Sequence, residues 1–283
     1  MFRNIGFDAV IIVSSVGAMI YYSLSILWPQ MLQYVCSQDI QQIGWQSCLL
    51  GGGVLIGQIF ANFGMVYVPK VKIQMIVVSV LVASFTTALV ALNQSNWGLT
   101  IAAGFILSFG IGYIENIAVT GVTLLWEPQD IGLASGILGS IRYLAGAIAQ
   151  ALYSSILSSK LQIFMQSNVA QAAAKAGLSP SAIPALLGSL AAGDLSTVPG
   201  ITPQIEAAAL KGETAAYTSA FHYVFYATIP FSVILIVGSV IFPNFEKYLT
   251  TEVARKLQLT RREPKTGLTK ERSAEKELSM DKV

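Results

Sequence analysis

Charged side chains are scarce in most of this 283-residue chain. Only 11% of the residues are Asp, Glu, Lys or Arg, whereas 54% are hydrophobic. No charged residue lies within 9–38, 40–69, 73–114 or 214–245. Each of these stretches is long enough for at least one helix of about 20 residues across a lipid bilayer. This scarcity of charge excludes an ordinary soluble domain and predicts an all-α, polytopic membrane protein.

Histidine and cysteine are also rare, and the motifs of common enzymes are missing. The chain has one His and two Cys residues. It contains no Gly-x-x-x-x-Gly-Lys-Ser/Thr loop for a nucleotide, so an ATP-driven pump needs another polypeptide. A single His excludes zinc sites built from two histidines, and no Ser, His and Asp set can be assembled within the apolar segments. We therefore expect no enzyme activity, no cofactor, no metal and no nucleic acid partner.

Apolar runs and the polar breaks between them predict six membrane-spanning helices. The predicted spans are 9–29, 44–67, 73–92, 98–126, 131–158 and 220–243. An even number of spans puts both termini on one side of the membrane. Lys and Arg are concentrated on that side, for example at Arg3, Lys70 and Lys72, so we expect both termini in the cytoplasm.

The connection between the fifth and sixth spans is unusually long. This outer loop, at 160–218, is rich in Ala, Gly and Pro. Its helix start and stop signals predict short helices at 161–176, 180–192 and 203–210. The loop is either a lid over the outer mouth or a loosely attached insertion. A charged tail at 246–283 follows the last span and is expected in the cytoplasm, without a packed core.

Cys36 and Cys48 lie near the outer ends of the first two predicted spans. A disulfide between them is one interpretation of their placement. The plainer one is two unpaired thiols that act as small apolar residues.

Small and polar residues predict how the helices pack. Glycines at intervals of about four residues in the second, fourth and fifth spans favour close approach of helix backbones. Polar side chains within the first, second, fourth and fifth spans predict that these helices line the interior. They are Tyr21, Tyr22, Gln46, Gln58, Asn62, Glu115, Asn116, Arg142 and Gln150. The third and sixth spans are more uniformly apolar and are expected to face lipid.

Glu115 and Arg142 are the main clue to function. A charged side chain in hydrocarbon costs roughly 2.5–3.5 kcal/mol on insertion scales and is usually kept for transport or proton handling. The fourth and fifth spans form a hairpin at 127–130, and both residues lie roughly 20 Å from this turn at 1.5 Å per residue. At equal depth, the two can form a pair that responds to a proton, a substrate or a helix movement. The alternatives are a static ion bridge or separate polar partners for the two residues.

Four further polar residues are candidates for the wall of a substrate cavity: Tyr22, Gln46, Gln58 and Asn116. A few polar groups among apolar walls suit amphipathic ligands of varied structure.

Short strings along the whole chain carry a resemblance to a known family. Among them are Met1-Phe2-Arg3-Asn4, Tyr21-Tyr22-Ser23-Leu24, Leu27-Trp28-Pro29, Ile43-Gly44-Trp45, Gly112-Tyr113-Ile114-Glu115, Glu127-Pro128-Gln129-Asp130, Gly139-Ser140-Ile141-Arg142, Val198-Pro199-Gly200-Ile201 and Lys247-Tyr248-Leu249-Thr250. Together they resemble the C-terminal half of fungal major facilitator permeases of the trichothecene efflux pump type, which are related to 14-span drug:proton antiporters. The resemblance implies one six-helix bundle of a major facilitator fold. It also implies a plasma-membrane exporter of toxins or other small amphipathic compounds, driven by proton antiport.

Carriers of this type rock one bundle against another around a central site, and the resemblance covers only the second bundle. The expected partners are therefore the bilayer, a small-molecule substrate, and either a separate N-terminal half of six or eight spans or a second copy of the chain. Two alternatives to a carrier stay open. The chain is then either an inactive truncated fragment, or a six-span channel or scaffold that works as an oligomer.

Overall fold

The computed structural model describes residues 4–36, 39–68, 70–91, 93–192 and 198–245. All regular secondary structure in these ranges is helical, which confirms the predicted all-α class. The helices are α1 (Ile5–Ser25), α2 (Trp28–Tyr34), α3 (Ile40–Tyr67), α4 (Val71–Ala88), η1 (Leu89–Ala91), η2 (Gln94–Asn96), α5 (Trp97–Leu125), α6 (Ile131–Phe164), η3 (Met165–Val169), α7 (Ala170–Lys175), η4 (Pro180–Ala182), α8 (Ile183–Ala192) and α9 (Pro203–Ile241). Within the described ranges, six helical segments are long and apolar enough to cross a membrane. The charged tail at 246–283 lies outside the described residues.

Particular side chains explain where α1 and α2 begin. The Asn4 side chain accepts a hydrogen bond from the Gly6 amide at 3.0 Å and so caps the first turn of α1. The first span is broken after Ser25, and α2 then begins with Pro29 in its first turn. Proline lacks an amide hydrogen, so it fits the first turn of a helix, where this hydrogen would have no partner. The single predicted first span is therefore two successive helices.

The closest helix contact is between α3 and α5, at glycines. A Cβ atom placed on Gly57 would lie 2.0 Å from the Phe109 carbonyl oxygen, and one placed on Gly112 would lie 2.1 Å from the Val54 carbonyl oxygen. Only glycine leaves room for this approach, which brings many backbone atoms into van der Waals contact. The predicted role of the glycines is confirmed for this pair of helices.

The glycines at the start of α6 behave differently. Gly132, Gly136 and Gly139 have open space where a side chain would begin, so no helix of the described chain packs on them. Among the α6 glycines, only Gly146 is in a close contact, with the ring of Tyr22 on α1. The row of glycines predicted to pack against another helix in the fifth span is thus mostly without such a contact in the described chain, and α6 is the least buried of the six spans.

The most apolar helices are not the least packed. α9 contacts α1, α4 and α6, and the hydroxyls of Ser79 on α4 and Ser239 on α9 are hydrogen bonded at 2.6 Å. Both helices still expose large apolar side chains, such as Val77 and Val237. One side of α4 and of α9 therefore packs on other helices, and only the opposite side of each remains to face lipid as expected.

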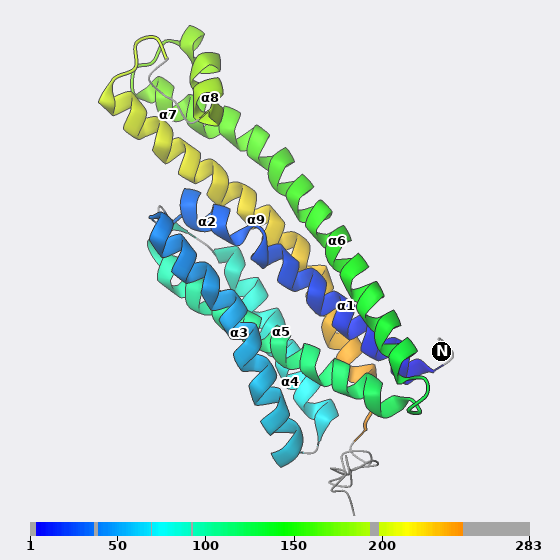
Figure 1. Cartoon of the computed structure of the whole chain (residues 1–283). Helices are drawn as coiled ribbons and strands as arrows, with labels where there is room; N and C mark the ends of the chain where they lie inside the picture. Colours follow the sequence, from blue (N-terminus) through cyan, green and yellow to red (C-terminus); the bar gives the residue numbers. More distant parts are fainter. Residues whose placement is uncertain (1–3, 37–38, 69, 92, 193–197, 246–283) are drawn as a thin grey trace, which may run out of the picture. The chain divides into compact units, whose positions relative to one another are not determined.

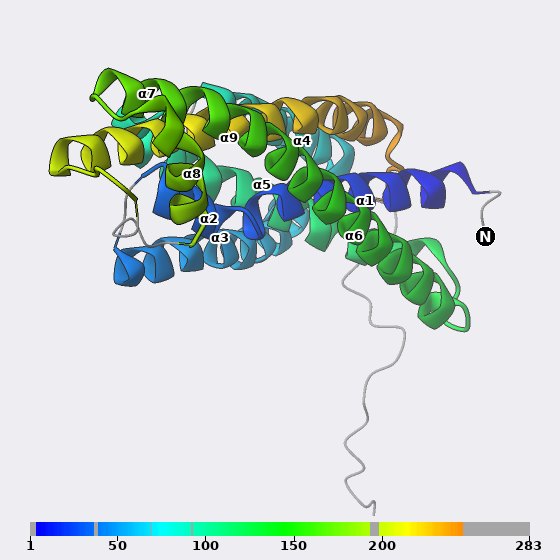
Figure 2. The same cartoon turned by 90° about the horizontal axis from the view of Figure 1, so that it is seen from above.

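α6 and α9 extend together beyond the other helices, and α7 and α8 pack at their far ends (Figures 1 and 2). α9 alone has 39 residues, which is about 58 Å of helix against a hydrocarbon core of about 30 Å. A second apolar cluster holds together α7, α8 and the start of α9, which are predicted to lie at the outer face and are called the outer cap below; the cluster includes Val169, Ala173, Leu186, Ile205 and Ala209. The connection between the fifth and sixth spans is therefore a packed unit with a core of its own.

Two of the three short helices predicted in this region are present. The first continues α6 through η3 and α7 up to Gly177, whose φ of +97° suits a glycine at a helix end. The second corresponds to η4 and α8. The prediction that the third ends before Gly212 is wrong, because α9 runs through this residue. Gly212 is buried against the backbone of Val169, where a Cβ atom would lie 2.9 Å from the Val169 Cα.

Candidate functional site

Glu115 on α5 and Arg142 on α6 form an ion pair between Glu115 Oε1 and Arg142 Nη2. The side chain of Glu115 is 8% exposed and that of Arg142 is 23% exposed. Counted from the last residue of α5, Leu125, and the first of α6, Ile131, the two lie about 15–17 Å along their helices, which is about half the thickness of a hydrocarbon core. The structure therefore brings together the two residues predicted to lie at one depth, and the alternative of separate partners is wrong.

Two neighbouring helices complete the surroundings of the carboxylate. Gln58 on α3 lies within hydrogen-bonding reach of Glu115, and Tyr21 on α1 is close enough to both charged groups to interact with them electrostatically. On the far side, the Arg142 guanidinium lies 5.7 Å from the ring centroid of Tyr143. Arg142 Nε is buried, and no hydrogen-bond partner for it is present among the described residues. The pair is thus held by α1, α3, α5 and α6 and keeps one donor unused.

A polar strip extends from the pair along α3 and α5. Asn116 donates a hydrogen bond from Nδ2 to Asn62 Oδ1 at 2.9 Å, and Asn62 in turn donates to the Gln58 carbonyl oxygen at 3.1 Å. Both asparagine side chains reach the surface of the described chain. Gln58 and Asn116 are therefore placed beside the ion pair on an accessible face.

The two other cavity candidates lie in different places. Tyr22 packs on Gly146, one turn of α6 beyond Arg142, and meets Tyr21 edge to face with ring centroids 5.8 Å apart. Gln46 is twelve residues before Gln58 on α3, which is about 18 Å along the helix axis. Tyr22 is thus next to the site, whereas Gln46 lies near the N-terminal end of α3 and does not join it.

Sequence reasoning missed a polar contact at the other end of α3. Gln74 on α4 donates to the carbonyl oxygens of Gly64, at 3.0 Å, and of Val68, and accepts from the Tyr113 hydroxyl. The Gly64 carbonyl oxygen also accepts from the Val68 amide at 2.9 Å, whereas Val68 follows the last residue of α3 and its carbonyl oxygen has no partner within that helix. A glutamine at the start of an otherwise apolar span was the available signal.

A helical membrane protein with an acid and a base paired between two of its long apolar helices has the features of a transport protein, since such residues in a span usually serve ion or substrate movement. The comparisons with known proteins specify the family. The model of the family described as "Fungal trichothecene efflux pump (TRI12)" matches residues 1–279, and the chain belongs to this family.

Three relatives of known name are similar to most of the chain. The trichothecene efflux pump TRI12 of Fusarium sporotrichioides is 22% identical over 258 residues, which are 89% of this chain and 43% of the relative. TRI12 of Trichoderma arundinaceum is 24% identical over 281 residues, 95% of this chain and 46% of the relative. The MFS-type transporter prx5 of Penicillium rubens is 26% identical over 233 residues, 81% of this chain and 42% of the relative. The chain therefore spans less than half the length of each of these relatives.

Proposed function

We propose that the chain is the C-terminal six-helix bundle of a proton-coupled efflux permease for toxins or other small amphipathic compounds. The observation that carries the proposal is the ion pair of Glu115 and Arg142, buried at mid-membrane and bordered by the polar strip of Gln58 and Asn116. The family and its relatives, which are named as efflux pumps and an MFS-type transporter, support the direction of transport.

The pair offers a simple way to couple a proton to a helix movement. α6 packs chiefly on α1 and α9 and much less on α5, so the ion pair is a principal link between α5 and α6. Protonation of Glu115 removes the negative charge and leaves the charge of Arg142 without its partner. A half-buried charge without a partner is still costly, so the protonated state favours a movement of α6 that brings Arg142 to water or to a substrate oxygen.

A second bundle is needed to close the cavity. In the described chain, large apolar side chains on α3 and α6 remain exposed, among them Phe60, Phe63, Tyr143 and Leu144. A hollow of about 460 Å³ is lined by α6 alone, at Gly132, Leu133, Gly136, Ile137, Ser140 and Ile141. We propose that a six- or eight-span N-terminal half, or a second copy of the chain, covers these faces. In this arrangement the protein lies in the plasma membrane with both termini in the cytoplasm.

The test uses the chain co-reconstituted in proteoliposomes with the N-terminal half of the Fusarium sporotrichioides relative. We expect export of a trichothecene to depend on the pH gradient, and Glu115→Gln to abolish this dependence. Glu206→Gln is the matched control, because Glu206 is an exposed carboxylate in the first turn of α9. Retention of gradient-driven export by Glu115→Gln would remove Glu115 from the coupling role. Ion conductance without substrate would instead favour an oligomeric channel.

A further inference from the structure

The outer cap contains a hollow that the proposed transport cycle does not use. Its volume is about 560 Å³, and it lies between the outer end of α6, the start of η3 and α8. The lining residues are Ser158, Leu161, Gln162, Met165, Gln166 and Leu187. Small-molecule sites in proteins typically have volumes of about 300–1,000 Å³, so the hollow is large enough for a ligand of this kind.

The hollow lies at the outer border of the membrane. Ser158 is 27 residues beyond Ile131, which is about 40 Å along α6, whereas the hydrocarbon core is about 30 Å thick. The neighbouring Lys160 is the first charge on α6 after Arg142, and its ammonium lies 4.4 Å from the ring centroid of Tyr223. A lysine held against an aromatic ring is typical of the headgroup region. A compound from the outer leaflet or from the medium can therefore reach the hollow.

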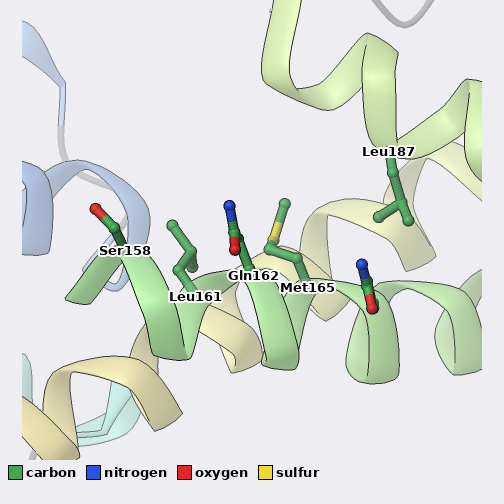
Figure 3. A pocket seen from close by; sticks show the side chains of 6 residues that line it. Ser158, Leu161, Gln162, Met165 and Leu187 are labelled. Atoms are coloured by element: carbon green, nitrogen blue, oxygen red, sulfur yellow. The ribbon is translucent and has the colours of Figure 1, made fainter. Parts of the chain in front are cut away.

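The hollow is lined by apolar and by uncharged polar side chains. Ser158, Leu161, Gln162 and Met165 point to one side of α6, and Leu187 points toward them from α8 (Figure 3). The polar members are a hydroxyl and two primary amides, which both donate and accept hydrogen bonds, and the others are apolar. None of the six carries a charge. Such a lining suits an uncharged molecule with an apolar body and several oxygen atoms.

The backbone at this point is also unusual. Residues Met165–Val169 form a π-helical turn, although the helix is regular α before and after it. π-helical turns are rare and occur often at functional sites. The turn begins at Met165 and includes Gln166, which are two of the lining residues.

We infer that this hollow is a binding site for a neutral, oxygen-bearing amphipathic small molecule at the outer face, separate from the mid-membrane ion pair. A flexible thioether and two amides let the site accept related compounds of somewhat different shape.

The test measures protection of a cysteine from a maleimide. The chain, with Cys36→Ala and Cys48→Ser, is placed in lipid nanodiscs, where both faces are accessible. Ser158→Cys is the reporter, and the adjacent Ser159→Cys is the control, because Ser159 is exposed but does not line the hollow. The probes are diacetoxyscirpenol, a neutral trichothecene, and rhodamine 6G, an amphipathic cation. We expect diacetoxyscirpenol to slow labelling at position 158 at least fivefold and to leave position 159 unchanged. Rhodamine 6G should protect neither position.

A second variant tests the role of the amide. Gln162→Leu keeps the side-chain volume but removes both hydrogen-bonding groups, so we expect the half-protecting concentration of diacetoxyscirpenol at position 158 to rise about five- to tenfold. Equal protection at positions 158 and 159 would mean general partitioning into lipid and would overturn the inference. Absence of protection at both positions would overturn it as well, and protection by rhodamine 6G would refute the neutral chemistry. The assay needs no transport, so its outcome is separate from that of the efflux test.

Discussion

At the scale of single residues, Glu115 and Arg142 are unequal partners. Because Glu115 is the more deeply buried of the two, removal of the arginine leaves a carboxylate that cannot reach water, whereas removal of the carboxylate leaves an arginine with a long side chain and a partly exposed head. The environment therefore tolerates a lone arginine better than a lone glutamate.

This asymmetry can be measured in detergent-solubilised protein. We expect Arg142→Gln to lower the free energy of unfolding by about 3 kcal/mol and Glu115→Gln to lower it clearly less. The double variant should lose less than the sum of the two single losses, because it leaves no unpaired charge. Additive losses would contradict the pairing of these two side chains.

Cys36 gives a second prediction at this scale. Cys36 and Cys48 form no disulfide in the structure, so the disulfide interpretation is wrong. Cys36 lies just beyond α2 and is 6% exposed, and burial raises the pKa of its thiol to about 11. Because the thiolate is the reactive form, we expect Cys36 to react at least a hundredfold more slowly with a maleimide at pH 7.5 than an exposed cysteine. The Cys48→Ser variant isolates this rate, and rapid labelling of that variant would contradict the burial of Cys36.

At the scale of helices, the contact of α3 with α5 depends on particular glycines. Gly57→Ala places a Cβ atom on the Phe109 carbonyl oxygen, so we expect a loss of about 1–3 kcal/mol in unfolding free energy. Gly52→Ala on the same helix meets open space and should be neutral or slightly stabilising, because alanine favours a helix more than glycine does. Thermal unfolding of the two variants side by side tests the contact, and equal behaviour would contradict it.

The end of α3 depends on one side-chain network. Tyr113→Phe removes the hydroxyl that donates to Gln74 but keeps the ring. We expect a loss of about 1 kcal/mol in unfolding free energy. Gln74→Leu should cost more, because it also leaves the Val68 carbonyl oxygen without its donor and removes one of the two donors to the Gly64 carbonyl oxygen. A smaller loss for Gln74→Leu than for Tyr113→Phe would contradict the capping role of Gln74.

Helix-scale features were predictable from the sequence to different degrees. Apolar runs and their polar breaks locate the six long helices, and counting residues from one hairpin turn places Glu115 and Arg142 at one depth. Neither argument says toward which neighbouring helix a side chain points. Neither therefore predicts that Gln58 reaches Glu115, or that no helix of the described chain packs on Gly132 and Gly136. The continuation of α9 through Gly212 was not predictable either, because glycine marks both a helix end and a close helix contact. Only the packing of α9 on Val169 distinguishes the two.

At the scale of the whole molecule, two of the exposed apolar surfaces of the described chain differ in the size of their side chains. One, on α4 and α9, includes Val77 and Val237 and has the large side chains that suit lipid. The other, on α6, combines Gly132, Gly136 and Ser140 in an open hollow. Small residues give little contact with disordered lipid tails but allow another helix backbone to approach closely. The two surfaces therefore suit different neighbours, lipid on one side and protein on the other.

This difference leads to a prediction about assembly. Gly136→Leu should leave the thermal stability of the chain alone nearly unchanged, because nothing in the described chain contacts that position. The same variant should prevent association with the N-terminal half of a relative and abolish export, because the leucine occupies the space meant for the partner helix. Val237→Leu on α9 is the control and should affect neither, since its side chain is 53% exposed and lies on another helix. Co-purification of the two halves measures association, and intact association of Gly136→Leu would exclude this face of α6 as the contact with the second bundle.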